Sequence, residues 1–148
     1  MKKFFFDCGT RDLTASFGIL FLRVATGLML MLGHGMDKLQ NYEAMRAKFT
    51  APNSLSGFLN GPIALILTIG AEVGAAGLIV LGLATRPAAF IVCFTMVIAA
   101  FDVHAGADFL TKEKALLYLI FGVTILLNGA GAFSIDAKLS KEGKRRRW

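Results

Sequence analysis

The sequence predicts an all-α integral membrane protein, a bundle of four antiparallel spanning helices with both termini in the cytoplasm. The chain has 148 residues, of which 55% are hydrophobic and only 18% are charged, and its mean hydropathy is positive. Four apolar segments follow one another along the chain, and basic residues gather at their ends. This composition excludes an ordinary soluble domain of the same size.

Each apolar segment is long enough to cross a membrane as a helix. The segments are residues 17–36, 62–84, 87–103 and 115–133. Helices of about 17 to 23 residues span a hydrocarbon core of about 30 Å. Arg23 interrupts the first segment and no small-residue cleavage site follows it cleanly, so we expect this segment to be retained rather than removed as a signal peptide.

The connections between the segments differ in length. Two residues separate the second segment from Pro87, which favours the first turn of a helix, so a tight antiparallel hairpin is expected. The first connection is much longer, and residues 40–50 carry Tyr42, Met45 and Phe49 at helical spacing. This spacing predicts a short amphipathic helix on the outer membrane surface, either a passive connector or a lid over the bundle.

The distribution of basic residues predicts the topology. Ten of them fall on the side of the two chain ends: Lys2, Lys3, Arg11, Arg86, Lys138, Lys141, Lys144, Arg145, Arg146 and Arg147. Five fall on the opposite side: Lys38, Arg46, Lys48, Lys112 and Lys114. Positive residues stay on the cytoplasmic side, so both termini are expected there. The net charge of +6 therefore reflects topology and not a basic surface for nucleic acid.

These assignments divide the chain into three parts: a cytoplasmic lead-in (1–16), a transmembrane domain (17–136) and a basic cytoplasmic tail (137–148). The tail ends at Trp148 and is expected to lie against anionic lipid headgroups. Cys8 and Cys93 form no C-x-x-C motif, so neither a disulfide nor a dithiol redox centre is predicted.

One face of the first apolar segment carries polar residues at helical spacing. Its members are Arg23, Gly27, Leu30, His34 and Asp37, and at about 100° per residue they fall within roughly 40° of one line. A charge at the bilayer centre costs about 2.5 to 3.5 kcal/mol on insertion scales. This face must therefore look into a protein interior or a cavity that contains water.

The second segment carries a carboxylate on one side and small residues on the other. We expect Glu72 to pair with Arg23 inside the bundle, because the two lie at similar depths and either charge alone would be costly. Gly70, Gly74 and Gly77 form a stripe facing away from Glu72. We expect this stripe to pack against a neighbouring helix, with a homodimer contact as the alternative.

A second polar cluster is expected near the outer surface. His34 and Asp37 end the first segment, Asp102 and His104 end the third, and Lys112 with Glu113 open the fourth. Such residues relay protons, hold a polar ligand head or form a simple interfacial cluster. No metal site is predicted, because residues two apart on a continuous helix point to different sides. The accessory residues are Lys38, Lys112, Tyr118 and Asn128. With 13 phenylalanines in the chain, a lateral pocket for a lipid-like or quinone-like ring is also considered.

The chain resembles the DoxX family of small four-helix membrane proteins over roughly residues 17–136. The resemblance rests on L-R-V-A-T-G and G-H-G-M-D-K-L in the first segment, on E-V-G-A-A-G-L-I-V-L-G-L-A-T-R-P-A-A in the second, and on a histidine after the third. Some members are tied to thiosulfate oxidation with quinone as acceptor, and others to a membrane oxidoreductase complex. The resemblance carries no catalytic residue onto this chain.

The combined expectation is an inner-membrane subunit of a redox system, with redox partner proteins and quinone as the candidate cofactor. In this interpretation Arg23 and Glu72 form the polar floor of the site, while the outer cluster handles protons. Two alternatives remain open: a non-enzymatic assembly or interaction protein of a membrane complex, and a transporter of a small acid or a proton. Association into a homo-oligomer is also open.

Overall fold

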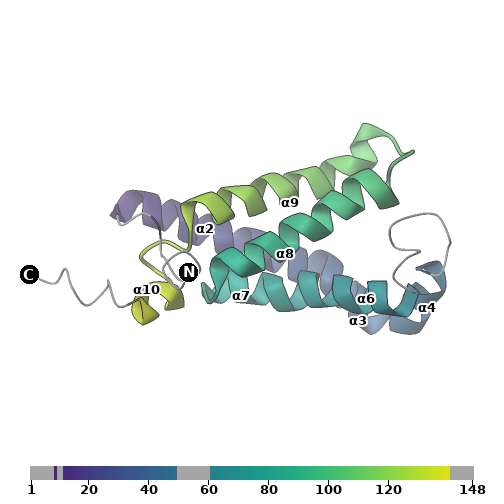
Figure 1. The fold of residues 1–148 in the computed structure, drawn as a ribbon, viewed down its shortest axis with the longest axis horizontal. Helices are drawn as coiled ribbons and strands as arrows, with labels where there is room; N and C mark the ends of the chain where they lie inside the picture. The colour runs from purple at the N-terminus through teal and green to yellow at the C-terminus, as the bar shows by residue number, and fades with distance from the viewer. Residues whose placement is uncertain (1–8, 10–11, 50–60, 141–148) are drawn as a thin grey trace, which may run out of the picture.

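The computed structural model describes residues 9, 12–49 and 61–140, and every regular element within them is helical (Figure 1). Parts of the predicted lead-in, first connection and basic tail, including Cys8 and Trp148, lie outside the described residues. The protein is thus all-helical over the described ranges. Among the described residues, three helices are long and apolar enough to cross a membrane, and they comprise Leu13–Gln40, Gly61–Leu81 and Thr85–Val103.

The first of these helices is longer than the sequence predicts. It consists of α2 (Leu13–Leu30), the π-helical segment η1 (Met31–Gly35) and α3 (Met36–Gln40). Asp12 fixes its start, because its carboxylate accepts a hydrogen bond of 2.7 Å from the Ala15 N–H. The helix therefore begins four residues before the predicted span of 17–36 and ends four residues after it.

A short helix, α4 (Tyr42–Lys48), follows the first long helix at once. It lies within the segment 40–50, where the sequence predicts an amphipathic helix. Helix α4 packs against α6 (Gly61–Ile69), the first part of the second long helix. Helix α4 therefore lies against the start of the second long helix.

The second and third long helices form a hairpin with a tight connection. After α6 the chain continues through η2 (Gly70–Ala75) and α7 (Ala76–Leu81). Gly82 ends α7 in the left-handed conformation, with φ of 69°, as helix-ending glycines commonly do. The predicted limits of 62–84 and 87–103 are displaced here, because the third helix begins at Thr85 and Pro87 is its third residue.

The third long helix comprises α8 (Thr85–Ile98) and η3 (Ala99–Val103), and α9 (Phe109–Asn128) follows it. Helix α9 begins six residues before the predicted span of 115–133 and ends five residues before its limit. Gly129, with φ of 80°, ends it. The chain then turns into the short helix α10 (Ile135–Leu139).

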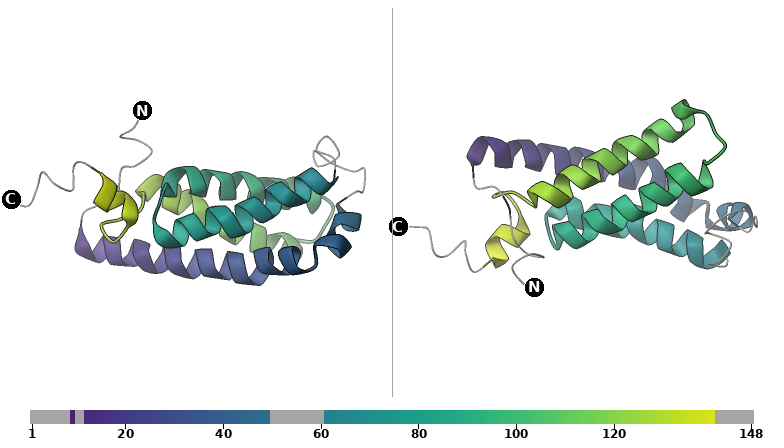
Figure 2. Two further views of the ribbon diagram at one scale, coloured as in Figure 1. Left: turned by 90° about the horizontal axis from the view of Figure 1, so that it is seen from below. Right: turned by 45° about the horizontal axis from the view of Figure 1, so that its top comes forward.

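The long helices pack in a closed circuit, so that each contacts two neighbours. Helix α2 packs on α7, α7 on α8, α8 on α9, and α9 on α2. Figure 2 shows α10 at the same end as the start of α2, and the opposite end holds α4. We call these the α10 end and the α4 end. Alanines fill much of the shared core, including Ala76, Ala89 and Ala100, and small side chains let helices approach closely.

Glycines also bring the first two long helices together, but they are not the predicted ones. A Cβ at Gly27 would lie 3.0 Å from the Ala76 carbonyl oxygen, and one at Gly35 would lie 3.1 Å from the Glu72 backbone. The predicted stripe of Gly70, Gly74 and Gly77 makes no helix contact among the described residues, since a Cβ on any of these residues meets nothing within 4 Å. These three glycines face outward, on the side of η2 and α7 away from the buried Glu72.

Candidate functional site

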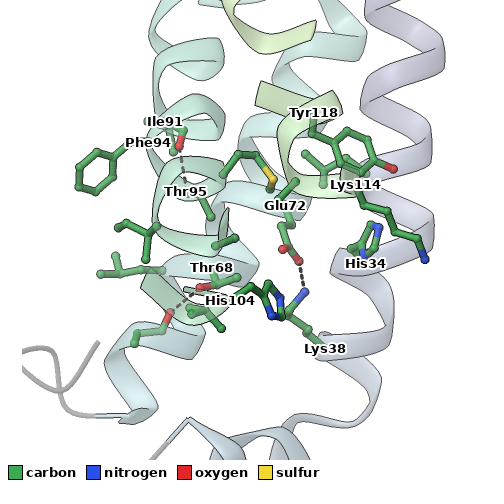
Figure 3. A pocket seen from close by; sticks show the side chains of 18 of the residues that line it. His34, Lys38, Thr68, Glu72, Ile91, Phe94, Thr95, His104, Lys114 and Tyr118 are labelled. Atoms are coloured by element: carbon green, nitrogen blue, oxygen red, sulfur yellow. Dashed lines mark hydrogen bonds and ion pairs between the residues drawn. The ribbon is translucent and has the colours of Figure 1, made fainter. Parts of the chain in front are cut away.

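A pocket of about 410 Å³ lies between the helices toward the α4 end (Figure 3). Its polar lining residues come from all the long helices and include His34, Lys38, Glu72, His104, Lys114 and Tyr118. Most of the remaining lining is apolar, and Phe49, which follows α4, contributes to it. A volume of this size falls within the range of small-molecule binding sites, roughly 300 to 1,000 Å³.

An ion pair forms the polar centre of the pocket. Lys38 Nζ donates a hydrogen bond of 2.6 Å to Glu72 Oε2, and the two side chains are 18% and 7% exposed. Lys38 comes from α3 and Glu72 from η2, so the pair joins the first two long helices at the pocket (Figure 3). Removing either partner would leave a nearly buried charge without compensation.

His34 and Tyr118 extend the polar side of the pocket toward α9. Their rings meet edge to face with centroids 5.6 Å apart. Glu72, Lys38 and Lys114 lie close enough to His34 for their charges to interact electrostatically with its imidazole ring. The pocket thus combines hydrogen-bond donors, one carboxylate and a histidine beside apolar walls.

Three long helices each contain a π turn at the pocket. In these wider turns the N–H groups bond five residues back, as from Met36 to Met31, Ala76 to Ala71 and His104 to Ala99. His34 lies in η1, Glu72 lies in η2, and η3 ends immediately before His104. Single π turns inside α-helices are often found at functional sites. Their coincidence here marks the pocket as the candidate site.

The π turn η1 also explains an error in the predicted face. An extra residue in one turn displaces every later side chain by about 100° around the helix axis. Lys38 therefore occupies the direction that a regular helix would give to Asp37. Asp37 is exposed and accepts a hydrogen bond of 2.7 Å from Asn41 Nδ2 instead.

The pocket brings together five of the predicted site residues, namely His34, Lys38, Glu72, His104 and Tyr118. Other predicted residues lie elsewhere. Asp102 does not line the pocket, although it is only two residues from His104. Lys112 donates a hydrogen bond of 2.7 Å to the Ala105 carbonyl, and Asn128 is exposed near the α10 end.

The predicted pairing of Arg23 with Glu72 is wrong. Arg23 is 1% exposed and donates a 2.8 Å hydrogen bond from Nη2 to the Phe133 carbonyl, near the α10 end. Glu72 instead packs level with Gly35, twelve residues or roughly 18 Å of helix beyond Arg23. The predicted depths of Arg23 and Glu72 differ from the observed ones because the first helix continues to Gln40. Lys38, and not Arg23, therefore lies at the level of Glu72.

Asp136 is the buried acidic residue near Arg23 that sequence reasoning missed. Its carboxylate accepts hydrogen bonds from the N–H groups of Ala84 (2.8 Å) and Thr85 (2.9 Å), at the start of α8, and its charge attracts Arg23. One signal was available, because Asp136 is the only acidic residue between Glu113 and Glu142. The hydrogen bonds of Arg23 and Asp136 therefore attach the segment that follows α9 to α2 and to the start of α8.

The chemistry available to the pocket is proton transfer and binding of a polar head beside an apolar body. Glu72 and His34 accept or release protons, while Lys38 and Tyr118 donate hydrogen bonds. Within the described ranges, no three His, Cys, Asp or Glu side chains are grouped as metal ligands.

Comparison of the sequence with known proteins shows which family the chain belongs to. Residues 18–105 match the family model described as DoxX. A protein of Haemophilus influenzae named "Uncharacterized protein" is 34% identical over 131 residues, covering 84% of this chain and 92% of that protein. A Bacillus subtilis protein named "Putative oxidoreductase CatD" is 31% identical over 129 residues, covering 86% and 90%. No solved structure gives a significant match. The chain belongs to the DoxX family of membrane proteins.

Proposed function

We propose that this protein is the membrane subunit of a quinone-linked redox system and that its pocket binds the quinone ring. The observation that carries the proposal is the Lys38–Glu72 ion pair in the wall of a largely apolar pocket. The name of the Bacillus subtilis relative supports an oxidoreductase role. The π turns that place His34 and Glu72 beside the pocket support it further.

The residues of the pocket fit the needs of a quinone. Lys38 and Tyr118 supply donors for carbonyl oxygens, and Glu72 and His34 hold or transfer the protons that accompany electrons. The apolar walls accept a ring and exclude water from it. When bound, a quinone supplies the electron-transfer chemistry, and a redox partner protein supplies or removes the electrons.

The proposal includes a place and an orientation in the cell. We place the chain in the inner membrane with α9 as a fourth span and both termini in the cytoplasm, as the distribution of basic residues favours. The α4 end, and with it the pocket, then lies toward the outer surface. The basic tail would contact anionic headgroups from the cytoplasmic side.

Binding of a quinone to the reconstituted protein tests the proposal. Glu72→Gln should weaken quinone binding about tenfold or more, because Glu72 holds Lys38, the charged donor to a ring carbonyl, in position, and hydrogen bonds to charged groups contribute about 1.5 to 3 kcal/mol. Glu43→Gln is the matched control, since Glu43 is exposed and its nearest partner is Arg46 at 3.9 Å. Equal affinities for the two variants, or no binding by the native protein, would contradict the proposal.

The same variants separate the alternative functions. An assembly or interaction protein would lose its fold when Glu72 is neutralised and would show no quinone affinity before that. A transporter would accumulate a small acid or protons in liposomes without a redox partner. In contrast, the quinone-binding subunit becomes less stable in Glu72→Gln but remains folded under the assay conditions, and its affinity for quinone falls. Circular dichroism and binding measured on one sample distinguish these outcomes.

A further inference from the structure

The pocket has a polar side and an apolar side that face different surroundings. The polar side lies toward α3, η1 and α9, where Lys38, His34 and Lys114 are found. The apolar side lies toward α6 and α8. In Figure 3 the labelled Ile91 and Phe94 lie on the side opposite His34 and Lys114, and the Phe94 ring points away from the ion pair.

Helices α6 and α8 separate from each other at this apolar side. Helix α8 packs on α7 and η2, whereas α6 packs on α3 and α4. Figure 1 shows α6 and α8 diverging from the α10 end toward the α4 end. The hairpin is therefore closed near Gly82 and open where the pocket lies.

One residue on each side of this gap both lines the pocket and is exposed. Leu67 on α6 is 55% exposed, and Phe94 on α8 is 56% exposed. Exposed lining residues on both α6 and α8 are what an opening of the pocket between these two helices requires. Thr111 and Lys114 are exposed at the polar side, in the first turns of α9, where water or lipid headgroups are expected.

With the long helices spanning the hydrocarbon core, the gap between α6 and α8 lies within that core. Phe94 is the tenth residue of the helix Thr85–Val103, which places it roughly 14 Å along a core of about 30 Å. Leu67 lies roughly 9 Å from the start of its helix by the same rise per residue. An opening at this level admits lipid tails rather than water.

We propose that the gap between α6 and α8 is a lateral opening through which the apolar tail of a membrane-dissolved ligand extends from the pocket. Leu67 and Phe94 form its two sides and determine which tails pass. The identity of the head rests on the proposed function, but the opening itself does not. The ligand class is a molecule with one polar ring and one long apolar tail, whose ring meets the ion pair while its tail stays in the bilayer.

Photolabelling from the lipid phase tests the opening without any quinone. The probe is a phospholipid with a diazirine on its acyl chain, in phosphatidylcholine vesicles that contain the full chain. Light should attach the probe to Met96 and Ala64, which line the pocket and are only 4% and 8% exposed. Labelling confined to outward-facing residues of the native protein would overturn the proposal.

A matched pair of variants shows whether the probe passes through the gap. Leu67→Trp fills the gap, whereas Ile66→Trp adds the same bulk at a neighbouring position that is 56% exposed and does not line the pocket. Labelling of Met96 should fall severalfold in Leu67→Trp and stay at the native level in Ile66→Trp. Equal labelling of the two variants would overturn the assignment of the opening.

Two quinones with the same ring separate this inference from the proposed function. Leu67→Trp should weaken binding of a quinone with a polyisoprenoid tail about tenfold, the loss expected for about two methylene contacts. Its affinity for the tail-free quinone should not change. Equal weakening of both quinones would overturn the opening. Photolabelling that depends on the gap, without binding of either quinone, would support the opening and would contradict quinone as the ligand.

Discussion

Two cations on the first long helix, Arg23 and Lys38, are neutralised in different ways. Lys38 forms a direct ion pair with Glu72 at the pocket. Arg23 donates to a backbone carbonyl and is attracted by the charge of Asp136, while its Nε and Nη1 make no hydrogen bond within the described residues. A sequence shows that a buried charge needs a partner, but the choice between Glu72 and Asp136 depends on helix length and on the turn after α9.

The Lys38–Glu72 pair should show strong energetic coupling. Lys38→Met or Glu72→Gln alone should lower the free energy of unfolding by about 3 kcal/mol, because each leaves a nearly buried group without its partner. The double variant should lose less than the sum of the two single losses. Unfolding followed by circular dichroism in detergent measures all three values, and additive losses would show that the pair is not coupled.

The effect of replacing a glycine by alanine on stability should depend on what the added Cβ would contact. Gly35→Ala should destabilise the protein by about 1 to 3 kcal/mol, because its Cβ would press on the Glu72 backbone and on Val73. Gly74→Ala is the control in the next helix, where a Cβ meets nothing within 4 Å. It should be neutral or stabilising by up to about 1 kcal/mol. The reverse order of thermal stability would contradict the packing of η1 on η2.

Among the elements, the π turns set the limit on what sequence periodicity predicts. The polar face of the first helix was correctly expected to be interior at Arg23, Gly27 and Leu30, all of which are buried. The same expectation is wrong for Asp37, which follows η1 and is exposed, because a regular helical period gives no sign of an inserted residue. The sequence assigns Glu72 to a polar floor with Arg23 and His34 to a separate outer cluster, and it gives Lys38 only as an accessory residue.

Helix α8 depends on a distant residue for the start of its first turn. Asp136→Asn should lower the free energy of unfolding by about 2 to 3 kcal/mol, because it weakens the cap of α8 and removes a charge near Arg23. Asp108→Asn is the matched control, since Asp108 precedes α9 but its side chain makes no capping bond. That change should stay within about 0.5 kcal/mol. Equal effects in denaturant titrations would contradict the capping role.

For the whole molecule, the crossing of α9 decides how many times the chain spans the membrane. Hydropathy and length identify the other three long helices as candidates, while α9 carries Lys112, Glu113 and Lys114 near its start. Its packing on α8 and α2 favours a fourth crossing. Sequence reasoning found all four long helices because apolar length is a strong signal. It misplaced some of their ends because a cap such as Asp136, which binds the first N–H groups of α8, acts through tertiary structure.

Single cysteines test the topology directly. In a chain with Cys8 and Cys93 replaced by serine, cysteines introduced at Asp12 and Ser140 should react with a membrane-impermeant maleimide from the same side. A cysteine at Gly106, between η3 and α9, should react from the opposite side. Labelling of Ser140 and Gly106 from one side would show that α9 does not cross.

We propose above that the pocket beside Lys38 and Glu72 holds a quinone ring. An electron-microscopy structure of the protein in a lipid nanodisc loaded with a tailed quinone tests this directly. We expect ring density within hydrogen-bond reach of Glu72, His34 or Lys38, with the tail leaving between α6 and α8. A pocket filled only by rearranged side chains, or quinone density on another face of the molecule, would contradict it.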